Sequence, residues 1–144
     1  SSAIAIQTAI FERDGEKLQA ELRKLLINTI SYNDTANESF YHGLTVGLCA
    51  AMNNYYYVYS NREAGEGRFD ICLCPQADKL PGVIIELKAC KGDSAETLEK
   101  LANKALEQIN DNQYDTDLRQ HGVKNIFKLG IAFCGKEVKV ACGE

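Results

Sequence analysis

The chain has 144 residues, of which 45% are hydrophobic and 25% charged, and this fits one globular domain with a substantial core. The sequence contains no stretch of about 20 apolar residues that could span a membrane and does not open with a signal segment. We therefore expect a cytoplasmic protein with no membrane partner. The net charge of −4 excludes nucleic-acid binding through bulk positive charge, so such binding would need a local patch or a partner domain.

The first part of the chain is predicted to be helical. Asp14 fits the N-cap of a helix that runs to about Ile30, with leucines on one stripe. A polar break at 33–35 leads to a second helix over about 36–52, which carries Phe40, Tyr41, Leu44 and Leu48 on its apolar side.

From residue 55 the hydrophobic period changes to that of strands. Three strands are predicted over 55–59, 68–74 and 83–90. A long helix follows over about 95–109, with a bent or broken continuation to Gln120 that Gly122 ends. Two more strands are predicted over 126–134 and 138–142, with a hairpin turn at Gly135-Lys136. This order predicts an α/β fold with a mixed central sheet flanked by helices.

The six cysteines are predicted to be reduced structural thiols. The sequence has no C-x-x-C pair, and five of the six lie in apolar runs, where cysteine acts as a small hydrophobic residue. A disulfide framework, a zinc site and a thiol-based sensor are the alternatives. The cysteines are Cys49, Cys72, Cys74, Cys90, Cys134 and Cys142.

The strand over 83–90 carries unusual charges for a central strand. Glu86 and Lys88 are two residues apart and therefore share one face, and Asp70 on the preceding strand could point to the same place. Two adjacent carboxylates repel unless one holds a proton or a cation lies between them, and Mg2+ prefers such oxygen ligands. Lys88 could then stabilise charge on a phosphate. The simpler alternative is a Glu86–Lys88 salt bridge with Asp70 unrelated.

These residues also carry a family resemblance. Residues 63–70, EAGEGRFD, and 84–88, IIELK, resemble the "G-x-G-R-x-D … h-h-E-h-K" signature of the PD-(D/E)XK nuclease superfamily. The matching order αβββαβ covers roughly residues 35–142. The resemblance implies a restriction-endonuclease-like core with an extra N-terminal helix. It also implies a nuclease that hydrolyses phosphodiester bonds of nucleic acid, most simply DNA.

The resemblance assigns roles to individual residues. It implies that Asp70 and Glu86 hold Mg2+, with Mn2+ as a substitute, and that Lys88 assists. Glu38 is similar to a helix carboxylate that completes the metal site in some members, although Thr35-x-x-Glu38 is also a capping box. Gln108 and Tyr114 resemble the glutamine and tyrosine of the second core helix, and Tyr114 could equally be a half-buried helix residue.

Other residues have simpler interpretations. His42 could be a general base, but a surface or packing role on its helix is favoured. Arg68 could contact a phosphate or pair with a nearby glutamate. Tyr55, Tyr56 and Tyr57 could stack on bases, but alternation along a strand favours core packing.

More narrowly, the chain resembles nuclease-like domains found C-terminal to an AAA-type ATPase domain in bacterial proteins. That setting implies an ATPase domain as partner. Residues 1–33 would be a helix and linker from an upstream domain, and residues 34–144 would be the nuclease-like domain. No phosphate-binding G-x-x-x-x-G-K-[ST] loop occurs in this sequence. The competing interpretation is a catalytically inactive module that binds nucleic acid or the ATPase domain.

Overall fold

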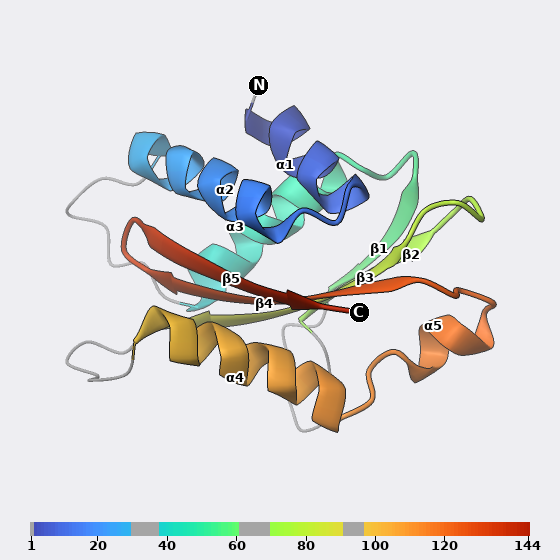
Figure 1. Cartoon of the computed structure of the whole chain (residues 1–144). Coiled ribbons are helices and arrows are strands. Elements are labelled where there is room, and N and C mark those ends of the chain that lie inside the picture. Colours follow the sequence, from blue (N-terminus) through green and yellow to red (C-terminus); the bar gives the residue numbers. More distant parts are fainter. Residues whose placement is uncertain (1, 30–37, 61–69, 91–96) are drawn as a thin grey trace.

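The computed structural model describes residues 2–29, 38–60, 70–90 and 97–144. Within these residues, five strands form one mixed sheet with helices on both faces (Figure 1). This confirms the predicted α/β class, the αβββαβ order and the restriction-endonuclease-like core. The helices are α1 (Ser2–Phe11), α2 (Gly15–Thr29), α3 (Glu38–Ala50), α4 (Leu98–Asp111) and α5 (Thr116–Gln120). The strands are β1 (Tyr56–Ser60), β2 (Ile71–Pro75), β3 (Gly82–Ala89), β4 (Ile126–Cys134) and β5 (Glu137–Gly143).

The strands lie in the sheet in chain order, so β3 is central and β1 and β5 are the edges. β3 and β4 pair in parallel, and the other neighbours pair antiparallel. The parallel pair requires a crossover, which α4 supplies. Gly135, with φ +58°, makes the tight turn between β4 and β5 in the left-handed conformation that suits glycine.

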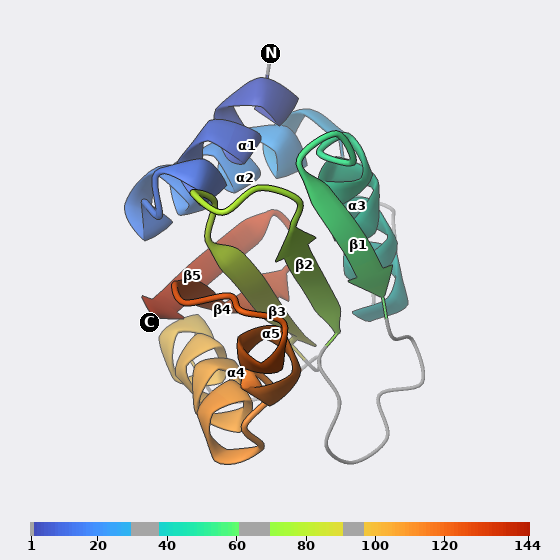
Figure 2. The same cartoon turned by 90° about the vertical axis from the view of Figure 1, so that its right-hand side faces the viewer.

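The two faces of the sheet carry different layers. Helices α1, α2 and α3 cover one face, and α4 with α5 covers part of the other (Figures 1 and 2). Strand β2 shows the expected alternation. Ile71 and Leu73 pack in the cluster with α1, α2 and α3, and Cys72 packs in the cluster on the side of α4 and α5. Helix α4 lies so close to β4 that a Cβ on Gly130 would meet the backbone oxygen of Ala102.

The N-terminal helices belong to the same core. Asp14 caps α2 as predicted, since its Oδ1 accepts a hydrogen bond from Lys17 N at 3.0 Å. Leu18, Leu22 and Leu26 of α2 are buried against the sheet. Helix α1 was not predicted, and it adds Ile6 to the same cluster of buried side chains.

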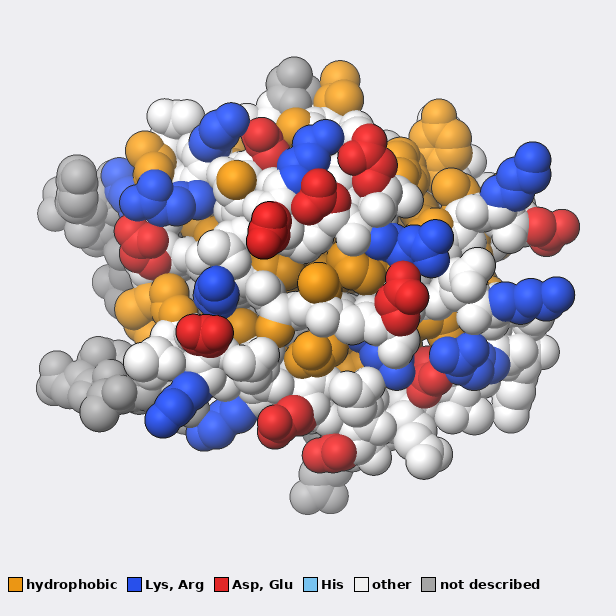
Figure 3. All heavy atoms as spheres, in the orientation of Figure 1, with side chains coloured by type: hydrophobic (Ala, Val, Ile, Leu, Met, Phe, Trp, Pro, Cys, Tyr) orange, Lys and Arg blue, Asp and Glu red, His pale blue; other side chains and the backbone are white. Residues whose placement is uncertain are grey.

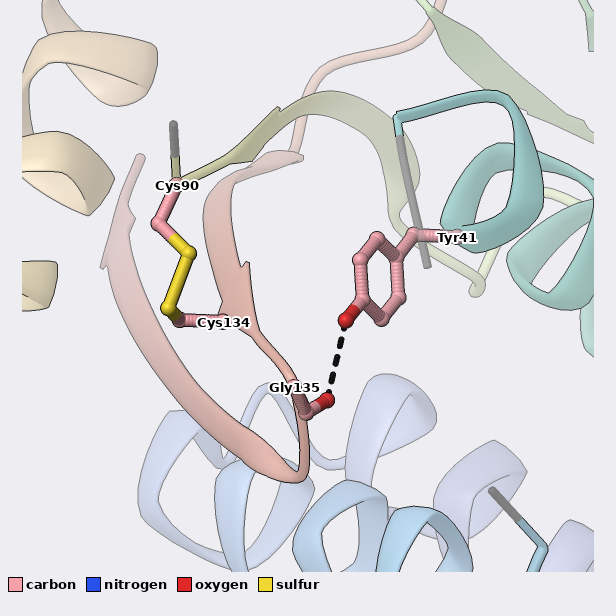
Figure 4. Close-up of a disulfide and its surroundings, with 4 residues drawn as sticks. All are labelled: Tyr41, Cys90, Cys134 and Gly135. Atoms are coloured by element: carbon pink, nitrogen blue, oxygen red, sulfur yellow. Dashed lines mark hydrogen bonds between the residues drawn. A yellow bond between two sulfur atoms is a disulfide. The ribbon is translucent and has the colours of Figure 1, made fainter. Parts of the chain in front are cut away.

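The prediction for the cysteines is wrong for one pair. Cys90 and Cys134 form a disulfide with a Cα–Cα distance of 5.1 Å (Figure 4). They follow Ala89 and Phe133, which are register partners in the parallel β3–β4 pair, so the fold places them side by side. The other four cysteines are free thiols, as expected.

Helix α3 is tied to the same end of the β3–β4 pair as the disulfide. The Tyr41 ring stacks on Phe133 with 4.4 Å between centroids, and its hydroxyl donates to Gly135 O at 2.9 Å (Figure 4). On the face shown in Figure 3, positive and negative side chains are interspersed without a stripe of one sign. None of the helices in the described part of the chain is long and apolar enough to cross a membrane.

Candidate metal centre

The two candidate carboxylates meet on neighbouring strands. Ile71 of β2 is the register partner of Ile85 of β3, so Asp70 and Glu86 are the next pair along the two strands. Asp70 N donates to Ile85 O at 3.2 Å, which extends the strand pairing to this position. Both side chains are buried, with 5% of Asp70 and 2% of Glu86 exposed. Two acidic groups are thus held together inside the sheet.

Asp70 is fixed by its own hydrogen bonds. Its Oδ2 accepts a hydrogen bond from the backbone N–H of Leu87 at 2.7 Å. This contact joins the carboxyl group to β3 immediately after Glu86. The orientation of Asp70 therefore depends on the local pairing of β2 with β3, and the side chain is held in place before any ligand binds.

The pKa of Asp70 is raised above its ordinary value, mainly because burial disfavours the charged form. The hydrogen bond from Leu87 N, the charge of His42, a side-chain hydrogen bond with Glu86 and the charge of Lys88 lower it only in part. A hydrogen bond between two carboxyl groups requires a proton on one of them. Two buried carboxyl groups this close are not readily ionised together, and a bound cation would relieve their repulsion.

Lys88 lies two residues beyond Glu86 on β3 and so points to the same face of the sheet. The residue is only half-buried, so it is partly accessible to solvent, whereas Asp70 and Glu86 are buried. Its charge acts on Asp70, whose pKa it lowers. The structure therefore brings together the three residues of the D…E-x-K pattern.

His42 joins this cluster from the other side of the sheet. The residue is buried in α3, and its Nε2 lies 3.4 Å from Asp70 O and 3.0 Å from Ser60 Oγ. The favoured packing role fits this environment, but the contact with Asp70 was not predicted. The available signal was helical spacing, since His42 lies four residues after Glu38 and on the same helix face. Glu38 begins α3, and its side chain lies outside the described residues.

Gln108 and Tyr114 are brought together at the C-terminal end of α4. Gln108 Nε2 donates to the Tyr114 hydroxyl at 3.4 Å, and Asn112 Nδ2 donates to it at 3.2 Å. Tyr114 is buried and joins the apolar cluster under α4 and α5. Nearby, the buried Lys128 donates to Asn110 Oδ1 at 3.0 Å, and the sequence did not single out this lysine.

The residues present fit a hard divalent cation. Asp70 and Glu86 offer carboxylate oxygens, the donor type that Mg2+ and Mn2+ select, and the pair needs a positive charge to be fully ionised. Among residues 2–29, 38–60, 70–90 and 97–144, no group of three or more His, Cys, Asp or Glu side chains could hold a metal. The centre therefore has two carboxylates in the described part of the chain. Arg68, like the side chain of Glu38, lies outside it.

The chain is similar to one family of known proteins over most of its length. A family model described as PD-(D/E)XK nuclease superfamily matches residues 36–142, which is most of the chain. The match spans α3 to β5 and contains Asp70, Glu86 and Lys88. No curated protein matched the chain.

Proposed function

Because the chain belongs to the PD-(D/E)XK nuclease superfamily, we propose that it hydrolyses phosphodiester bonds of nucleic acid at the centre formed by Asp70, Glu86 and Lys88. One observation carries the proposal. Two buried carboxyl groups face each other between β2 and β3, and a lysine lies on the same face at the solvent border. A structural role alone does not account for two acids at this place, because burying them together is unfavourable.

In this proposal Asp70 and Glu86 hold Mg2+, or Mn2+ in its place. A bound cation would lower the pKa of a water molecule and neutralise phosphate oxygens. The hydrogen bond from Leu87 N fixes Asp70 in the orientation in which it meets Glu86. Lys88 contributes a positive charge that stabilises the extra negative charge on the phosphate during hydrolysis. Glu38 is proposed as a further ligand, and Gln108 as a residue of the catalytic face.

A second candidate function is a catalytically inactive module that binds nucleic acid or an ATPase domain. The observation that favours it is that only two carboxylates meet in the described part of the chain. The net charge of −4 also fits a surface that serves a protein partner. Tight binding of nucleic acid without cleavage in Mg2+ or Mn2+ would identify this alternative.

The substrate, the partner, the location and the domain bounds are proposed from the resemblance of the sequence to PD-(D/E)XK nuclease-like domains. We propose DNA as the nucleic acid, an AAA-type ATPase domain as partner, and the cytoplasm as the location. We also propose residues 1–33 as the connection to an upstream domain and 34–144 as the nuclease-like unit. The Cys90–Cys134 disulfide is the observation that argues against this location, because thiols are kept reduced in the cytosol.

The experiment that tests the proposal is a cleavage assay on single- and double-stranded DNA and RNA in Mg2+, Mn2+ and EDTA. Wild type should cleave only with metal. Lys88→Ala should lose cleavage but keep the fold, because the lysine lies at the border of the core. Lys79→Ala is the matched control, since Lys79 is an exposed lysine in the turn between β2 and β3. Cleavage by Lys88→Ala at the rate of this control would refute the assignment of Lys88.

A further inference from the structure

The edge strand β1 carries an exposed aromatic pair. Tyr56 is buried in the core, as alternation predicts, whereas Tyr57 and Tyr59 are 57% and 54% exposed. The core-packing expectation is therefore correct for Tyr56 and wrong for Tyr55 and Tyr57, because Tyr55 is also 53% exposed. Exposed tyrosines at alternate positions of one strand have their rings on the same side of the sheet.

The exposed pair lies on the face of the sheet that carries the carboxylates. Tyr57 and Tyr59 are the register partners of Cys74 and Cys72, and Cys72 in turn pairs with Ile84 of β3. Register partners share a face, and Glu86 and Lys88 follow Ile84 at intervals of two. Helices α4 and α5 cover this face over the middle of the sheet, and β1 lies at the margin away from α4 (Figure 2).

The aromatic pair is continuous with the candidate metal centre. Asp70 precedes Cys72 by two residues, so it is the diagonal neighbour of Tyr59 across β1 and β2. Diagonal neighbours in a sheet are about 7–8 Å apart. Tyr57 lies one further step of about 6.4–6.8 Å along β1. The two rings therefore form a track that begins beside Asp70 and leads away from it along the edge of the sheet.

This spacing selects one kind of nucleic acid. The bases of a stacked strand are separated by about 3.4 Å, and their faces are covered by one another. Two rings about twice that distance apart can each take a base only when the strand is stretched and its bases are unstacked. Aromatic stacking is the usual means by which proteins hold single strands without reading their sequence. An acidic chain also has to rely on stacking more than on phosphate neutralisation.

We propose that Tyr57 and Tyr59 are a stacking platform that holds the unstacked bases of a single-stranded nucleic acid next to Asp70. This inference rests on the proposed function for the identity of the ligand and adds the class of substrate. DNA and RNA share the base faces that the platform binds, so the experiment includes both.

The test measures binding of labelled single-stranded oligonucleotides by fluorescence anisotropy in EDTA, with oligo(dT), oligo(U) and a duplex of equal length as ligands. Tyr57→Ala and Tyr59→Ala should each weaken single-strand binding by about 5- to 150-fold. Tyr57→Phe and Tyr59→Phe should bind like wild type, because phenylalanine keeps the ring. Tyr55→Ala is the matched control, since Tyr55 is similarly exposed but lies before β1, where its ring contacts Phe11. Melting temperatures of all variants check the fold.

A second readout reports on the rings themselves. The chain has no tryptophan, so its intrinsic fluorescence comes from its tyrosines. Oligonucleotide binding should quench this tyrosine emission in wild type. A variant that carries both Tyr57→Phe and Tyr59→Phe should still bind the oligonucleotide, but it should lose the part of the quenching that comes from these two tyrosines.

Three results would overturn the inference. They are equal single-strand binding by the alanine variants and the control, tighter binding of the duplex than of the single strand, and a shift from dimer to monomer in the alanine variants. The last would show that the edge of β1 pairs with a second copy. Because the assay contains EDTA, these results leave the metal centre untested, and a failed metal titration likewise leaves the platform intact.

Discussion

The hydrogen bond between Asp70 and Leu87 allows the structural and chemical roles of Asp70 to be separated. Asp70→Ala removes the acceptor of the Leu87 N–H group, which is buried in β3. An unsatisfied buried donor costs about 1–3 kcal/mol. Asp70→Asn keeps an oxygen in the same place and can still accept this hydrogen bond. Both variants lose the ionised carboxylate.

We therefore expect Asp70→Ala to be less stable than Asp70→Asn by about 1–3 kcal/mol. For a chain of this size, that difference corresponds to a melting temperature lower by about 4–12 °C. Thermal unfolding followed by circular dichroism in EDTA measures it, and urea unfolding provides the free energy. Equal stability of the two variants would show that the Asp70 side chain is not the acceptor for Leu87 and would refute the geometry of the centre.

Three further predictions follow from the packing and the titrating groups. Gly130→Ala should lower the free energy of unfolding by at least about 1–3 kcal/mol in urea, because the new Cβ would meet the backbone of α4. Burial raises the pKa of the Cys49 and Cys72 thiols to about 12, so in a mass-spectrometric assay at pH 8 they should resist alkylation in the folded protein, whereas the exposed Cys142 should react. The pKa of Asp70 is higher in the folded than in the unfolded chain. Without metal, the folded state therefore binds more protons than the unfolded state at pH values between these two pKa values. Stability should fall as the pH rises across this window, and urea unfolding should show a flatter profile for Asp70→Asn.

The sequence predicted the centre because the signals there are local. The alternation in β2 and the charged pair within an apolar strand depend only on the period of two along each strand. Together they predicted that Asp70, Glu86 and Lys88 share one face. The register of β2 with β3 is consistent with this prediction, because it makes Asp70 and Glu86 the next pair after Ile71 and Ile85. The position of β3 in the middle of the sheet followed from its apolar residues on both faces.

The features that the sequence did not predict depend on contacts between distant segments. The Cys90–Cys134 disulfide arises from the parallel register of strands 44 residues apart, which spacing along the chain cannot reveal. The exposure of Tyr57 depends on how far α4 and α5 extend over the edge of the sheet. Helix α1 is rich in apolar residues without a clear polar face, so it lacks the periodic contrast that identified α2.

The central claim is that Asp70 and Glu86 together bind a divalent cation. Calorimetric titration with Mg2+ and Mn2+ at neutral pH tests it most directly, on wild type, Asp70→Asn and Glu86→Gln. Asp78→Asn is the control, because Asp78 is an exposed carboxylate in the turn between β2 and β3. We predict that wild type and the control bind metal and that both site variants lose binding. Absence of binding in wild type, or unchanged binding in either site variant, would contradict the claim.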